Sequence, residues 1–107
     1  MSTLFINGEW LAGTGAAMSK TNPATAESIW QGQGADAAQV DAAVTYARQA
    51  FKGWARTALD ERIAIARRFG ELLTANKDAL ATIIAKETGK PMWEALTEVT
   101  TMVNKVE

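Results

Sequence analysis

The segment AKETGKPMWEA, residues 85–95, decides how the second half of this chain folds. One helical pattern of apolar residues runs up to Thr88, and a second begins directly after Pro91. A glycine such as Gly89 commonly ends a helix in the left-handed conformation, and proline suits the first position of a new helix. Lys90 would lie beside the last carbonyl groups of the first helix, where a positive charge is favourable. The segment therefore predicts a joint between two helices.

The same letters also suggest a phosphate-binding loop, because Gly89-Lys90 lies next to a threonine. That loop requires Gly-x-x-x-x-Gly-Lys-Ser/Thr between a strand and a helix. Here Ile84 stands where the first glycine is needed, Pro91 follows the lysine, and the preceding residues have a helical pattern. The helix joint explains the segment better than a nucleotide site does.

Composition narrows the functional classes. The chain has 107 residues, of which 48% are hydrophobic and 21% charged, as is typical of a globular protein, and its net charge is -1. That charge provides neither the basic field for nucleic acid nor a polybasic membrane anchor. There are no cysteines or histidines, so these residues offer no disulfide, thiolate or imidazole chemistry. No apolar run reaches the ~20 residues of a membrane span, and no signal peptide is visible, so we expect a cytoplasmic protein.

The first third of the chain has the pattern of strands and turns. Leu4-Phe5-Ile6 and Glu9-Trp10-Leu11 flank Asn7-Gly8, the strongest short signal for a β-hairpin. Residues 12–19 are small and glycine-bearing, which predicts a loop. A turn is expected at Asn22-Pro23, followed by a strand over residues 27–32.

A helical period begins at Asp36, which forms a capping-box pair with Gln39. This first helix is predicted to end near Lys52-Gly53, with Trp54 folding back, and a second helix to start near Thr57. The second helix has an apolar stripe and a charged face that we expect to be solvated: Ile63, Ala66, Phe69, Leu72 and Leu73, against Arg62, Arg67, Arg68 and Glu71. A third helix is expected up to Thr88, after a break at Asn76, and a fourth from Met92 onward. The predicted fold class is α+β, with strands over residues 4–34 and three to four helices over residues 36–107.

The last predicted helix runs to Glu107, and no glycine, asparagine or proline stop signal follows it. The helical body is also small for an independent core, and the strands have no visible sheet partner beyond one hairpin. We therefore expect the chain to be a segment of a longer protein, with the rest of the same polypeptide as its main partner.

Few residues here suggest chemistry by themselves. Glu94 and Glu98 are four apart and share a helix face, but without histidine, cysteine or a metal motif a solvated or interfacial face is the stronger interpretation. The same holds for Glu87. The chain also has four tryptophans, which usually anchor cores and interfaces.

Taken together, the sequence resembles the N-terminal segment of the aldehyde dehydrogenase superfamily. Four blocks carry the resemblance, in matching order and spacing: Ile6-Asn7-Gly8-Glu9-Trp10, Asn22-Pro23-Ala24-Thr25, Ala50-Phe51 with Trp54, and Glu87-Thr88-Gly89-Lys90-Pro91. One departure is Ala26, which replaces the glycine usual after that threonine. A finer likeness, to the branch that oxidises N-succinylglutamate semialdehyde in bacterial arginine catabolism, rests on four further blocks: Ile29-Trp30-Gln31-Gly32, Asp36-Ala37-Ala38-Gln39-Val40, Trp93-Glu94-Ala95 and Thr97-Glu98-Val99-Thr100.

The resemblance implies an NAD-dependent enzyme, active as a homo-oligomer, of which these residues form part of the NAD-binding domain region. In the family a cysteine attacks the aldehyde, hydride passes to NAD, and a glutamate assists hydrolysis. Those groups and the cofactor contacts fall outside this chain, so we expect it to be inactive alone.

The resemblance also implies two sets of site residues. The backbone carbonyl of Thr21 and the carboxylate of Glu87 match positions that hold a monovalent cation in some relatives. Glu98 and Met102 match positions facing the substrate tunnel, and Lys105 lies three residues further on, where it could meet a substrate carboxylate. The alternative to the enzyme is a free-standing helical interaction module with a tryptophan-rich binding surface.

Overall fold

The computed structural model describes all residues 1–107 and contains four strands followed by four helices. The chain divides into two compact units, one formed by residues 1–20 and 30–57 and the other by residues 21–29 and 58–107. The predicted α+β class is confirmed. No helix is both long enough and apolar enough to cross a membrane.

The first unit begins with the expected hairpin, in which β1 (Leu4–Ile6) pairs antiparallel with β2 (Glu9–Leu11). Asn7 and Gly8 connect the strands with φ angles of 52° and 81°. Positive φ at both central residues is the requirement of the type I′ turn, which matches the twist of paired strands. Phe5 lies opposite Trp10, with ring centroids 5.2 Å apart.

A second two-stranded sheet joins β3 (Ala17–Thr21) to β4 (Ser28–Gln33). The expected loop over residues 12–19 is therefore wrong at its end, because residues 17–19 are strand. Pairing extends the ladder beyond the strands, since the Gly15 amide donates to Gly34 O and the Gly34 amide to Ala16 O, both at 2.9 Å. The small residues that suggested a loop instead allow close backbone approach: a Cβ on Gly13 would lie 2.2 Å from Gln33 O.

Helix α1 (Ala37–Arg56) starts at the predicted capping box. The Asp36 carboxylate accepts from the Gln39 amide at 2.8 Å, and Gln39 Oε1 accepts from the Asp36 amide at 3.2 Å. The predicted end at Gly53 is wrong. The helix continues through Trp54, and Thr57, expected to cap the next helix, ends this one by donating its hydroxyl to Gly53 O at 3.1 Å.

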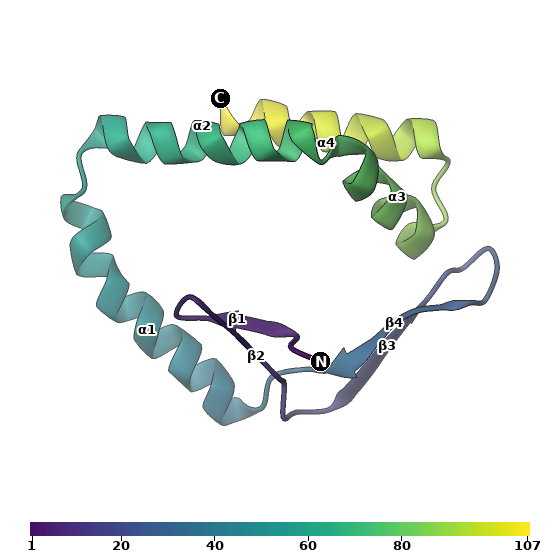
Figure 1. The fold of residues 1–107 in the computed structure, drawn as a ribbon, viewed down its shortest axis with the longest axis horizontal. Coiled ribbons are helices and arrows are strands. Elements are labelled where there is room, and N and C mark those ends of the chain that lie inside the picture. The colour runs from purple at the N-terminus through teal and green to yellow at the C-terminus, as the bar shows by residue number, and fades with distance from the viewer. The chain divides into compact units, whose positions relative to one another are not determined.

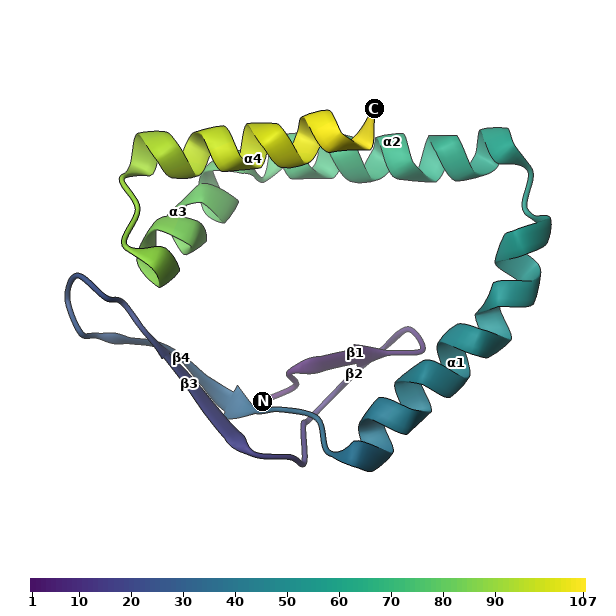
Figure 2. The same ribbon diagram turned by 180° about the vertical axis from the view of Figure 1, so that it is seen from behind.

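The second unit contains α2 (Leu59–Ala75), α3 (Lys77–Thr88) and α4 (Met92–Val106). Helix α4 packs against both α2 and α3, and it runs alongside α2 in both views of the ribbon (Figures 1 and 2). Asn76 forms the break between α2 and α3, as predicted, and its side-chain amide donates to Leu72 O at 2.8 Å. The acidic residues Asp60 and Glu61 lie in the first turn of α2.

The core of this unit is small. Its fully enclosed side chains are Ala81, Ala95 and Val99, packed where α3 meets α4, with Leu73 of α2 also buried. Gly70 of α2 lies against Val106 of α4.

Two predictions about α2 need correction. Leu73 is buried, but Phe69 and Leu72 of the predicted apolar stripe are 57% and 44% exposed, because contact with α4 covers only one side of the helix. Arg62, expected on the solvated face, is only partly exposed, and its Nε is buried without a hydrogen-bond partner.

Candidate functional site

The joint between α3 and α4 has the geometry that its sequence predicts. Gly89 ends α3 in the left-handed region with φ 77°, and its amide donates to Ala85 O at 2.9 Å. The Thr88 hydroxyl donates to Ile84 O at 2.7 Å and accepts from the Lys90 amide at 3.2 Å. Pro91, predicted at the first helical position, is instead the N-cap of α4, and the helix begins one residue later at Met92. The segment is therefore a helix joint, and its glycine is a helix end.

The Lys90 side chain does not remain at the end of α3. Its Nζ forms an ion pair with Glu94 Oε1 at 3.5 Å and hydrogen-bonds to Glu98 Oε1. The hydrogen bond to Glu98, reinforced by the charges of Glu98 and Glu94, raises the pKa of Lys90 above its usual range. This lysine remains protonated at every physiological pH, so the two carboxylates face a permanent positive charge.

Glu94 and Glu98 share a helix face, as predicted, and the spacing continues that face to Met102 and Lys105. We call these four residues together with Lys90 the α4 stripe. Its members are all at least partly exposed, in contrast to Ala95 and Val99 on the packed side of the helix. Lys105 lies at the far end of the stripe, in the last turn of α4. The tunnel-facing role implied for Glu98, Met102 and Lys105 stays a prediction.

The tip of the β3–β4 hairpin belongs to the same unit as the joint. Asn22 Oδ1 accepts from the Ala24 amide at 2.9 Å, which forms the turn expected at Asn22-Pro23. A Cβ on Gly89 would lie 3.1 Å from Pro23 Cγ, so the tip touches the joint. Ala26 has φ 60° and so occupies the region that favours glycine.

This contact bears on the cation expected at Thr21 and Glu87. Pro23 and Gly89 are each two residues from one of the expected donors, so the Pro23–Gly89 contact brings the two segments together. No group of three or more acidic, histidine or cysteine side chains is present that would hold a divalent metal. One carboxylate with backbone carbonyls suits a hard, weakly bound cation, so the donor chemistry is compatible with the expected site.

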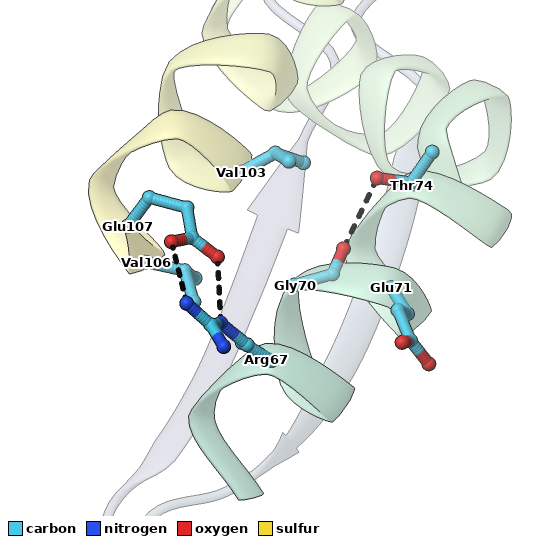
Figure 3. Close-up of a pocket in the computed structure, with 7 residues that line it drawn as sticks. All are labelled: Arg67, Gly70, Glu71, Thr74, Val103, Val106 and Glu107. Carbon is cyan, nitrogen blue, oxygen red and sulfur yellow. Dashed lines mark hydrogen bonds and ion pairs between the residues drawn. The ribbon is translucent and has the colours of Figure 1, made fainter. Parts of the chain in front are cut away.

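A separate hollow of about 270 Å³ lies between α2 and α4 (Figure 3). Arg67 closes one side by binding Glu107, with Nε and Nη2 donating to the two carboxylate oxygens at 3.1 and 3.4 Å. The remainder is lined by Gly70, Glu71, Thr74, Val103 and Val106. Its polar side chains are already bonded: the Thr74 hydroxyl donates to Gly70 O at 3.1 Å, Glu71 pairs with Arg68 at 2.8 Å, and Glu107 pairs with Arg67. We therefore assign it no catalytic role.

The Gly89-Lys90 segment does not form a cradle for a dinucleotide. The cradle for a pyrophosphate is a glycine-rich turn that follows a strand and opens a helix. Gly89-Lys90 follows a helix instead, and the Lys90 ammonium is already paired with two carboxylates. We therefore derive no cofactor contact from this chain.

Comparison with known proteins identifies the wider context. The profile of the Aldehyde dehydrogenase family matches residues 10–107. N-succinylglutamate 5-semialdehyde dehydrogenase of Chromobacterium violaceum is 64% identical over 100% of this chain, and that of Escherichia coli K12 is 56% identical over 97%. These alignments cover 22% and 21% of the relatives, so the chain spans about a fifth of their length.

Solved structures show the same fold. A NAD-dependent benzaldehyde dehydrogenase from Corynebacterium glutamicum superposes with a TM-score of 0.92 at 32% identity, over 95% of this chain and 22% of its own. A NADP-dependent glyceraldehyde-3-phosphate dehydrogenase from Bacillus halodurans, complexed with NADP, gives 0.91 at 26% identity, over 96% and 22%. The matches favour an enzyme segment over a free-standing interaction module.

Proposed function

Because this chain belongs to the aldehyde dehydrogenase family, we propose that its protein oxidises N-succinylglutamate 5-semialdehyde to N-succinylglutamate with NAD in bacterial arginine catabolism. The carrying observation is the 64% identity, over the whole of this chain, to an enzyme named for that substrate. The balanced reaction consumes the aldehyde, water and NAD⁺ and releases the acid, NADH and a proton. Solved structures of the same fold are named as NAD-dependent or NADP-dependent enzymes, and of the two cofactors we propose NAD.

These 107 residues would act as a scaffold in that reaction. They contain no cysteine, so the thiolate that attacks the aldehyde would come from another part of the polypeptide. We propose that they form part of the NAD-binding domain region of a cytoplasmic homo-oligomer. Sedimentation of the full-length enzyme would test the oligomer. The purified 107-residue chain is expected to form no NADH from this aldehyde above a buffer control.

We also propose that the α4 stripe borders the substrate passage through Glu98, Met102 and Lys105. The substrate carries carboxylates, and Lys105 has the complementary charge and an exposed side chain. A hydrogen bond between charged groups contributes about 1.5–3 kcal/mol, so Lys105→Ala should lower kcat/KM roughly tenfold to a hundredfold.

The test compares that variant of the full-length enzyme on N-succinylglutamate 5-semialdehyde and on hexanal, an uncharged aldehyde. Lys86→Ala, which removes an exposed lysine from the last turn of α3, is the matched control. Loss confined to the charged substrate supports the proposal. Equal losses on both aldehydes mean that Lys105 supports the fold.

For the cation, we propose that Thr21 O and the Glu87 carboxylate bind potassium or sodium in the full-length enzyme. Thermal unfolding measured with potassium, sodium or a bulky organic cation gives a readout independent of activity. A stabilisation by potassium or sodium that disappears in Glu87→Gln, but persists in the surface control Glu61→Gln, is the expected result. Equal stabilisation in wild type and Glu87→Gln would exclude this site.

A further inference from the structure

The α4 stripe begins with two carboxylates that share one lysine. Lys90 belongs to the joint, yet its ammonium lies along the first two turns of α4, against Glu94 and Glu98. All three side chains remain 35–41% exposed, so they stay accessible to a ligand that approaches this face. No hydrogen bond or ion pair other than these holds the Glu98 carboxylate.

The order of charges along the stripe has a consequence for ligands. Glu94 and Glu98 contribute two negative charges near Met102, whereas Lys105 contributes one positive charge beyond it. Without Lys90 this face would be negative overall and would repel a carboxylate. With Lys90 paired to both glutamates the stripe is neutral, and the free cation Lys105 stands at one end.

We propose that Lys90 is a positioning residue for specificity: by pairing with Glu94 and Glu98 it cancels one of their two negative charges and allows aldehydes that carry carboxylates to pass along α4. This inference rests on the proposed function, because it takes the stripe as a border of the substrate passage. Lys90 acts through Glu98 and touches no reacting atom.

The experiment uses the full-length enzyme with four variants: Lys90→Met, Lys90→Arg, Glu98→Gln and the double variant Lys90→Met/Glu98→Gln. Each is assayed on N-succinylglutamate 5-semialdehyde, on succinate semialdehyde and on hexanal, with kcat and KM determined separately. Lys77→Met is the matched control, because Lys77 Nζ also binds α4, at 2.8 Å from Thr100 Oγ1, on a side of the helix away from the stripe.

Lys90→Met should raise KM for both carboxylated aldehydes about threefold to tenfold, the effect of one uncancelled charge at a partly exposed site, with a smaller change in kcat. KM for hexanal should stay within about twofold. Lys90→Arg should avoid most of this rise in KM, because arginine keeps the positive charge. The double variant should also have a KM near the wild-type value for the carboxylated aldehydes, because it removes the negative charge that Lys90 cancels. Lys77→Met should change KM for all three aldehydes to the same extent.

Equal rises in KM for hexanal and the carboxylated aldehydes would overturn the inference, as would a double variant that fails to recover. Either result would assign Lys90 to the stability of the helix joint. If wild type oxidises hexanal and succinate semialdehyde but not N-succinylglutamate 5-semialdehyde, the proposed substrate is wrong, while the comparison of the first two still decides the role of Lys90. An enzyme that oxidises none of the three would overturn both proposals.

Discussion

Replacing Gly89 by alanine should destabilise the α3–α4 joint more than the same change at Gly8 destabilises the β1–β2 hairpin. Both glycines have nearly equal φ angles, 77° and 81°. An alanine in this region costs about 1–2 kcal/mol, offset by about 0.5–1 kcal/mol because glycine loses more entropy on folding. The surroundings differ: a Cβ at Gly8 has nothing within 4 Å, whereas one at Gly89 lies 3.1 Å from Pro23 Cγ.

That contact should add about 1 kcal/mol at Gly89, the lower end of the range for overpacking. The total for Gly89→Ala is then about 1.5–2 kcal/mol, against about 0.5–1 kcal/mol for Gly8→Ala. Combining Gly89→Ala with Pro23→Ala should remove the part of the destabilisation that comes from this contact, because the second change removes Pro23 Cγ. The three variants therefore separate backbone strain from side-chain contact.

Hydrogen exchange measured by mass spectrometry on the full-length enzyme is the appropriate assay, since it reports local opening where global unfolding of a large protein is not two-state. Peptides covering residues 77–106 should exchange more than tenfold faster in Gly89→Ala. Peptides covering residues 1–12 should change by only a fewfold in Gly8→Ala. Equal effects at the two sites, or no recovery on adding Pro23→Ala, would show that the hairpin tip does not press on the joint.

Three further predictions follow from local geometry. Ala26→Gly should slow exchange at the β3–β4 turn by a fewfold, because Ala26 has φ 60°, and unchanged exchange would contradict that conformation. Gly70→Ala should be neutral or stabilising by up to about 1 kcal/mol, since its Cβ would meet Val106 at an ordinary contact of 3.4 Å, whereas Gly70→Leu should loosen α2 from α4 in the same assay. Hydrogen bonds from Thr14 and from the Gln39 amide lower the pKa of Asp36 below its ordinary 3.8. The ionised carboxylate therefore stabilises α1 fully above pH 3.8, and this stabilisation is lost as pH falls through the lowered pKa. The stability gap between wild type and Asp36→Asn should therefore narrow below about pH 3.8, and a constant gap would mean that the charge does not matter.

The features that sequence predicted correctly are those with one local cause. Asn7-Gly8 specified its turn because few residues tolerate positive φ in succession, and Asp36 with Gln39 specified a helix start because the two side chains satisfy each other's backbone amides. Gly89 specified a helix end for the same local reason. In each case the residues that determine the geometry are adjacent in the chain.

The errors come from competition between neighbouring signals. The sequence predicts a helix end at Gly53, but glycine in a helix costs only about 1 kcal/mol, and the hydroxyl of Thr57 supports the last turn by donating to Gly53 O. The sequence predicts a loop at residues 17–19, because the pairing of β3 with β4 that makes them a strand depends on residues more than ten positions away. Long-range pairing of this kind leaves little trace in a short, small-residue segment.

The candidate site was predictable in its positions and not in its contacts. Glu94 and Glu98 were correctly placed on one face, but Lys90 was assigned to the carbonyl groups of α3. Its spacing of four from Glu94 was the signal that pointed to the ion pair. The choice between the two depends on the path of the chain through Pro91, which turns α4 toward the lysine and which no local pattern specifies.

The seam between α3 and α4 constrains which sequences this segment tolerates. Its enclosed side chains are two alanines and one valine, so little volume is available to lose by truncation, and most substitutions at Ala81 or Ala95 add atoms. Added atoms force the helices apart, because a close-packed interior has no space to accommodate them. The seam therefore acts as a size filter on mutation: it sets an upper limit on side-chain volume at Ala81 and Ala95. Substitutions at these two positions should destabilise the protein through added side-chain volume more than through added polarity.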